Sequence, residues 1–210
     1  MRPTTPLFHA VTPKNGFVYL LRHRQGPVII NTKNEVTDKL IRSQLPPSRV
    51  PKAERVHDWS LLCVACLPDK DAELALKFYL LELKRKRERL YSADPDLAKT
   101  WYSDKFPKRH GRTYEAVSDL ENALEYLYTR PTVESAPRVP KPKNVTQPFD
   151  VRMPERSTTI YWTNEWYKGA DELWKGDVEH KRLPVLGMGG DVLKAIFGLE
   201  KEAAKDAQLQ

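Results

Sequence analysis

A run of basic side chains, LELKRKRERLY at residues 81–91, is the part of this sequence with the clearest chemical potential. Five cations stand in the six positions that end at Arg89: Lys84, Arg85, Lys86, Arg87 and Arg89. Only Glu88 interrupts them. Lysine and arginine at this density are suited to neutralising the phosphates of a nucleic acid.

The same run also fits the solvated end of a helix. Cations near a helix C-terminus are favoured by the helix dipole, and Glu82–Lys86 and Lys84–Glu88 have the spacing of ion pairs. At about 100° per residue, however, the five cations point all round the helix, and Arg87 falls within a stripe of leucines. We therefore expect this end of the helix to project from the core, with its cations available to nucleic acid.

A second basic group, KFPKRHGR at residues 105–112, follows nearby and is preceded by the aromatic residues Trp101, Tyr102 and Phe106. Basic side chains interleaved with aromatic ones can combine phosphate contact with base stacking. The predicted RNA-binding residues are thus those of the two groups: Lys84, Arg85, Lys86, Arg87, Arg89, Lys108, Arg109 and Arg112.

Cys63 and Cys66 form a lone C-x-x-C pattern. A redox dithiol needs its first cysteine at a helix N-terminus, and a zinc site needs four ligands. Here both cysteines lie within an apolar run, and His57 is the only nearby further ligand. The pattern predicts two buried free thiols.

No catalytic residue, cofactor site or metal site is predicted. The stretch LPVLGMGGDVLKAIFG, residues 183–198, has the order strand, glycine loop, helix, but it lacks the further glycine and the following strand of a dinucleotide site. The five histidines are scattered, outside any metalloprotease or hydrolase motif. The glycines are expected only to let the backbone turn into the last helix.

The apolar pattern predicts an α+β body over residues 1–130. Runs at 16–22 and 26–31 predict a β-hairpin, and 56–67 predicts a buried strand. Thr32 is expected to cap a short helix that carries Val36, Leu40 and Ile41. Two amphipathic helices follow: one is capped by Asp69 and carries Leu76, Leu80, Leu83 and Leu90, and the other covers 113–128.

Two further segments follow the body. Residues 131–157 hold six prolines and no glycine, which predicts a stiff, extended, basic arm. Residues 158–210 are expected to form a C-terminal helical extension. It would contain a short strand at 158–163, an aromatic helix at 164–176 and a last helix at 189–208 capped by Asp191.

Composition indicates the kind of partner. The net charge of +7 favours an anionic partner such as RNA or a membrane surface. No apolar run is long enough to span a membrane, and the first residues lack the apolar core of a secretory signal. The first acidic residue is Glu35, so the start fits either an organelle-targeting segment or a basic contact arm.

This layout resembles the general style of organellar ribosomal proteins, in which a modest body carries extensions over RNA and neighbouring subunits. It implies a non-catalytic structural subunit of the mitochondrial ribosome on the matrix side, which contacts rRNA and neighbouring proteins. The alternative is a peripheral accessory subunit of a respiratory-chain complex or ATP synthase. No small-molecule substrate is expected in either case.

Overall fold

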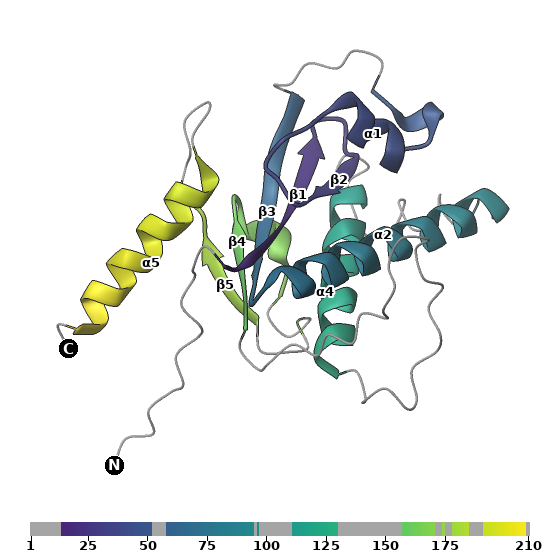
Figure 1. Cartoon of the computed structure of the whole chain (residues 1–210). Helices are drawn as coiled ribbons and strands as arrows, with labels where there is room; N and C mark the ends of the chain where they lie inside the picture. The colour runs from purple at the N-terminus through teal and green to yellow at the C-terminus, as the bar shows by residue number, and fades with distance from the viewer. Residues whose placement is uncertain are drawn as a thin grey trace.

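The computed structural model describes residues 14–51, 58–94, 96, 111–129, 157–170, 174, 178–184 and 191–208. Its elements are β1 (Gly16–His23), β2 (Val28–Asn31), α1 (Asp38–Gln44), η1 (Pro47–Arg49), β3 (Trp59–Leu67), α2 (Lys70–Ala93), α4 (Gly111–Thr129), β4 (Thr158–Trp162), η4 (Glu165–Lys168), β5 (Val178–Arg182) and α5 (Val192–Gln208). Helices and strands combine in one mixed α+β body, which confirms the predicted fold class (Figure 1).

One five-stranded sheet, in the order β2-β1-β3-β4-β5, organises the described part of the chain. The first three pairings are antiparallel, and β4 and β5 run parallel. The predicted hairpin and buried strand are confirmed as β1, β2 and β3. Strand β5, with the sequence VEHKR, was missed because it has only one apolar residue and lies at a partly exposed edge.

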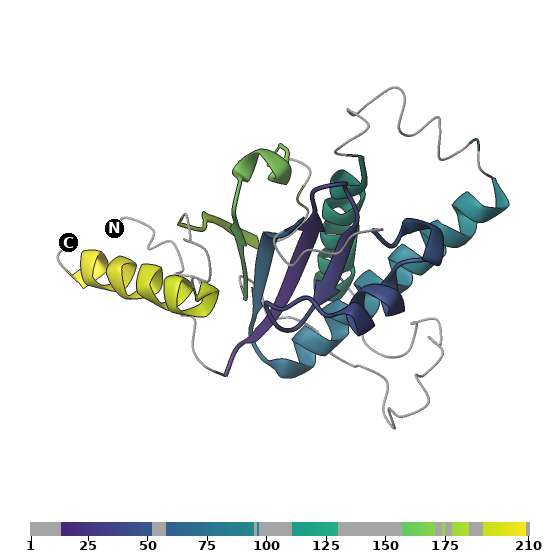
Figure 2. The same ribbon diagram turned by 90° about the horizontal axis from the view of Figure 1, so that it is seen from above.

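Helices α2 and α4 cover one face of this sheet, and α5 lies on the opposite side (Figure 2). The stripe predicted for α2 is confirmed at Leu76 and Leu80, which are buried against β1, β3 and α4. Leu83 is partly buried, whereas Leu90 is half exposed, because α2 extends beyond the sheet. The helix begins after Asp69, whose carboxylate accepts a hydrogen bond from the Ala72 N–H, as predicted.

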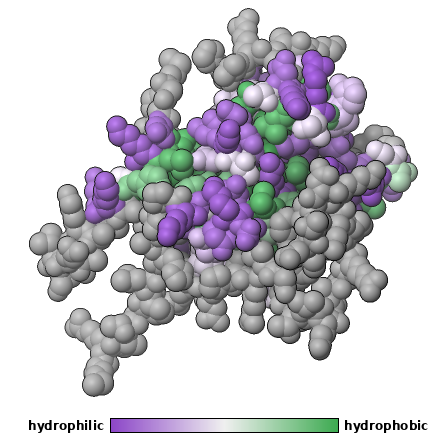
Figure 3. Space-filling view, in the orientation of Figure 1, coloured by the Kyte–Doolittle hydropathy of each residue, from purple (hydrophilic) through white to green (hydrophobic). Residues whose placement is uncertain are grey.

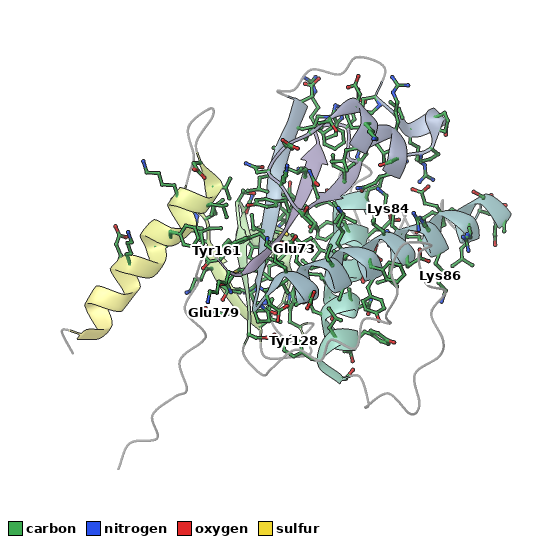
Figure 4. All side chains as sticks on the ribbon, in the orientation of Figure 1. Glu73, Lys84, Lys86, Tyr128, Tyr161 and Glu179 are labelled. Atoms are coloured by element: carbon green, nitrogen blue, oxygen red, sulfur yellow. The ribbon has the colours of Figure 1, made fainter. Side chains whose placement is uncertain are left out.

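A close approach fixes the start of α2 against β1. An added Cβ at Gly16 would lie 2.3 Å from the carbonyl oxygen of Asp69 and 2.5 Å from Cβ of Glu73. The buried Glu73 carboxylate accepts a hydrogen bond of 2.7 Å from the Phe17 N–H (Figure 4). Glycine is therefore required here for space, so that helix and strand backbones can meet.

The opposite face holds a second core, to which α1 and α5 contribute. Val192 and Ile196 of α5 are buried there, and Phe197 packs edge-to-face on Phe17 at 6.4 Å. The predicted cap of α5 is confirmed, since the Asp191 carboxylate accepts hydrogen bonds from the N–H groups of the first turn. On the face seen in Figure 3, apolar side chains form small patches among hydrophilic ones.

Helix α1 begins later than predicted. Thr37, not Thr32, is the N-cap, and its hydroxyl accepts a hydrogen bond from the Leu40 N–H. Gln44 at the end of α1 bonds both backbone groups of Ile30, at 2.9 and 2.6 Å. This side chain occupies hydrogen-bonding positions of the edge strand β2 that would otherwise be open to another strand.

The C-terminal third also differs from the prediction. Of the aromatic helix expected at 164–176, the described residues form only the short 3-10 helix η4, which ends at Gly169 with φ 76°. Strands β4 and β5, assigned to a separate extension, complete the sheet of the body, so the boundary drawn at 158 divides one sheet. Of the proline-rich arm, only Ser157 is among the described residues.

Candidate nucleic-acid interface

The helical phase of α2 divides the basic run into two sets. Arg85, Lys86 and Arg89 are exposed and lie within an arc of about 100°, since they are separated by one, three and four positions. We call these three residues the basic face. Lys84 and Arg87 lie on the other side, in phase with Leu80, and both are only partly exposed. The expectation that all five cations project into solvent is therefore wrong.

Arg87 is held by carboxylates of α4. Its two terminal nitrogens each donate to one oxygen of Asp119, both at 2.5 Å. Its Nε lies 3.4 Å from Glu115, and Glu115 in turn accepts a 2.7 Å hydrogen bond from the Tyr91 hydroxyl. This network joins α2 to α4 just beyond the apolar core. Arg87 therefore has a structural role, and its charge is neutralised inside the protein.

Lys84 is likewise directed into the body. Its ammonium group donates a 2.9 Å hydrogen bond to the carbonyl oxygen of Val28, the first residue of β2. In Figure 4, Lys84 lies on the side of α2 that faces α1, and Lys86 extends from the other side. Burial lowers the pKa of Lys84 to about 8, although the nearby Glu88 carboxylate opposes part of this shift. A lysine in this position is poorly placed to meet a phosphate.

The basic face keeps its charge largely free for an external partner. Arg85 forms an i,i+3 pair with Glu82 at 2.6 Å, but its side chain stays 60% exposed, where such a pair contributes little. Glu88, the one acid inside the run, is paired with Arg49 at 3.2 Å. The two nearest acids in sequence, Glu82 and Glu88, therefore do not cancel the positive charge of the basic face.

Of the basic side chains in the second predicted group, only Arg112 is among the described residues. Lys108 and Arg109 lie outside the described residues, as do Trp101, Tyr102 and Phe106. Arg112 stands in the first turn of α4 and lines a small pocket together with Arg49, Lys84 and Arg87. Three carboxylates line the same pocket, those of Glu88, Glu115 and Asp119. Because these acids balance most of its cations, the pocket itself is not an anion site.

The end of α2 and the turn between β1 and β2 lie at the same end of the sheet. Val28, which Lys84 contacts, pairs with Arg22 beside the turn. Thr163, which follows β4, bonds the carbonyl groups of Leu61 and Leu62 near the start of β3, so η4 lies at this end too. The turn adds Arg24, whose side chain is 75% exposed.

Three aromatic residues that the sequence prediction did not select also meet at this end. Tyr114 of α4 lies 5.6 Å from Trp166 and 6.5 Å from Tyr167, both of η4, measured between ring centroids. We call these residues the aromatic cluster. The sequence carries a signal for it, since Trp166 and Tyr167 are adjacent, but nothing in the sequence places them next to Tyr114.

The two cysteines cannot act together on one metal or form a disulfide in this fold. Both are buried, as predicted, and they are not joined in a disulfide. Cys63 belongs to the core under α2 and α4, whereas Cys66 belongs to the core on the opposite face, because side chains three apart on a strand point to opposite sides. Burial raises the pKa of the Cys63 thiol far above its ordinary value, so this thiol stays protonated. Among the described residues, no group of three or more His, Cys, Asp or Glu side chains is arranged to hold a metal ion.

Residues 185–190 of the glycine loop lie outside the described residues. Within the described part of the chain, no helix is long and apolar enough to cross a membrane.

Comparison with known proteins gives one informative similarity. The chain matches no family model. It is 24% identical over 190 residues to a protein of Candida albicans whose name is large ribosomal subunit protein mL67. The match covers 79% of this chain and 67% of the relative.

Proposed function

We propose that this chain is a structural protein of the large subunit of the mitochondrial ribosome, located in the matrix, with rRNA and neighbouring proteins as its partners. The observation that carries this proposal is the similarity to a large ribosomal subunit protein over 79% of the chain. The same function was predicted from the sequence layout, without that similarity. The role is structural and not catalytic.

The basic face supports a contact with RNA phosphates. Arg85, Lys86 and Arg89 stand close together on one side of a helix end that extends beyond the sheet. Each cation that meets a phosphate releases counterions, which makes such binding favourable and dependent on salt. Lys108 and Arg109 immediately precede α4 in the sequence, and with Arg112 they are proposed to extend this contact.

Lys84 and Arg87 serve RNA binding indirectly. They anchor α2 to β2 and to α4, and they thereby hold the helix end at a fixed place relative to the sheet. A rigid support of this kind reduces the entropy that a bound surface must lose. The proposal of direct contact with phosphate is therefore limited to the three exposed cations of the run and the second basic group.

The experiment compares two charge reversals in the full-length chain expressed in mitochondria. The first variant carries glutamate at Arg85, Lys86 and Arg89. The control carries glutamate at Lys14, Lys194 and Lys201, three exposed lysines outside α2, with the same change in net charge. Sedimentation of detergent-solubilised mitochondria at two salt concentrations measures the fraction of the chain that travels with the large ribosomal subunit.

We expect the wild type and the control to travel with the large subunit, and the first variant to be depleted from it at both salt concentrations, with the larger difference from the wild type at the lower salt. With purified large-subunit rRNA, losing three phosphate contacts should make the plot of log Kobs against log salt shallower by about two to three. If both variants stay fully associated, the basic face does not contact RNA. If the wild type migrates with a respiratory-chain complex or ATP synthase instead, the proposed function is wrong.

A further inference from the structure

Trp166 is unusually exposed for a tryptophan. It keeps 57% of its surface accessible, more than any other large hydrophobic side chain reported as exposed among the described residues. Tryptophan carries a large apolar area, and its exposure on a folded surface commonly marks a contact site. An indole this exposed buries little surface and contributes little to the stability of the fold, so its exposure points to a role in binding.

The backbone holds Trp166 firmly in this position. The Thr163 hydroxyl donates to the carbonyl groups of Leu61 and Leu62 in β3 at 2.9 and 3.0 Å. The Asn164 side chain then caps η4 by accepting a 3.0 Å hydrogen bond from the Trp166 N–H. The short helix is thus tied to the end of the central strand, and the exposed indole sits on a fixed support.

The neighbouring rings fix the orientation of the indole. Tyr114 and Tyr167 both meet Trp166 edge-to-face, at 5.6 and 5.3 Å between centroids and with interplanar angles of 67° and 68°. Tyr167 is itself fixed by Arg22, which donates a 2.5 Å hydrogen bond to its hydroxyl and lies 5.3 Å from its ring centroid. The aromatic cluster is therefore an ordered surface that needs little rearrangement to accept a flat partner.

Cations surround this cluster. Arg22 touches Tyr167, Lys168 follows it in η4, and Arg112 stands in the same first turn of α4 as Tyr114. The exposed acid beside them is Glu165. Asp58, at the same end of the sheet, is paired with Arg24 at 3.3 Å. The described charges at this end are thus mainly positive, which suits an anionic chain.

We infer that Trp166, supported by Tyr114 and Tyr167, stacks on an unpaired base of single-stranded RNA. An exposed ring offers its face to any base, and nearby cations meet the phosphates on either side of that base. A paired base cannot reach the ring, because its faces are covered by its neighbours in the helix. This inference rests on the proposed function, and it gives the RNA contact a chemical class, an unstacked nucleotide in a loop or bulge.

The test measures binding of the purified full-length chain to two labelled probes, a 12-nucleotide single-stranded RNA without secondary structure and a 12-base-pair RNA duplex. Three variants are compared: Trp166→Ala, Trp166→Phe and, as a matched control, Leu74→Ala. Leu74 is also a large exposed apolar residue, at 47%, but it lies in the second turn of α2. Circular dichroism and thermal unfolding check that each variant is folded, which is expected because both positions are exposed.

We expect Trp166→Ala to weaken binding to the single strand by roughly 5- to 100-fold. Trp166→Phe should retain part of the affinity, because a phenyl ring still stacks. All three variants should bind the duplex as tightly as the wild type does. Leu74→Ala should also bind the single strand as tightly as the wild type does. Indole fluorescence should fall when the single strand binds to the wild type, and fall less in Trp166→Phe.

Two results would overturn the inference. If Trp166→Ala binds the single strand as tightly as the wild type, no base stacks on this ring. If Trp166→Ala lowers incorporation into the ribosomal particle without changing affinity for RNA, the cluster binds a protein. In both cases the proposed function stands as long as the reversal of the basic face lowers RNA affinity, so failure of the stacking site is distinguishable from failure of the function.

Discussion

Arg87 of α2 and Asp119 of α4 form a two-pronged ion pair in which both nitrogen–oxygen distances are 2.5 Å. The Arg87 side chain is 20% exposed and that of Asp119 is 11% exposed. Two helices that share one face of the sheet are therefore joined by a partly buried ion pair where their apolar contact ends. Such a pair contributes geometry more than net stability, because desolvation of the two charges offsets much of their attraction.

Removing one member of this pair should destabilise the protein strongly. Arg87→Met leaves Asp119 and Glu115 buried without their cation, and we expect the free energy of unfolding to fall by about 3–5 kcal/mol. The double variant Arg87→Met with Asp119→Leu should recover a large part of this loss, since the unpaired carboxylate is gone. Urea unfolding followed by circular dichroism measures both. Equal stability of the single variant and the wild type would contradict a structural role for Arg87.

Two glycine substitutions should have opposite effects. Gly16→Ala places a methyl group 2.3 Å from the Asp69 backbone oxygen and should lower stability by about 1–3 kcal/mol, because a backbone must move. Gly198→Ala, within α5, meets nothing within 4 Å and should raise stability by about 0.5–1 kcal/mol, because alanine favours the helix. Thermal unfolding of both variants checks this contrast. If Gly16→Ala is as stable as the wild type, α2 and β1 pack less closely than the structure shows.

The buried ammonium of Lys84 should make stability depend on pH. Its pKa falls from the ordinary 10.5 to about 8 in the folded protein because of burial. Between these two values the unfolded chain holds a proton that the folded chain has released, so the contribution of Lys84 to the free energy of unfolding rises with pH. Lys84→Met should therefore be at least as stable as the wild type at pH 7, and its advantage should shrink between pH 8 and pH 10.5.

The matched control for this experiment is Lys86→Met, which removes an exposed lysine two positions further along the same helix. Its stability relative to the wild type should change little over the same pH range. Lys86→Met should weaken RNA binding more than Lys84→Met does, because Lys86 is proposed to meet a phosphate directly whereas Lys84 only anchors the helix. A stability difference between Lys84→Met and the wild type that is constant from pH 7 to pH 10.5 would contradict the buried position of the ammonium.

The amino-acid sequence by itself determined the elements whose apolar pattern is strong and local. The β-branched and aromatic run of β1 and the continuous apolar run of β3 predict strands, and the Asp69 and Asp191 caps predict where α2 and α5 begin. These features depend on neighbours within a few positions, so no tertiary contact is needed to read them. The phase of α2 is equally local. It already places Arg87 in line with Leu80, which is a sign that this arginine turns inward.

Only the tertiary structure decided which cations are available. Whether a cation in the apolar stripe stays out of solvent depends on a partner 32 positions away, Asp119, and no local pattern reveals that pairing. The polar strand β5 exists because β4 offers it a parallel partner, and α1 starts after Thr37, where Ile41 is buried in the second core. The aromatic cluster likewise joins residues of α4 and η4 that lie about fifty positions apart in the chain. Sequence sets the local shapes and the charge, whereas long-range packing selects the residues that face a partner.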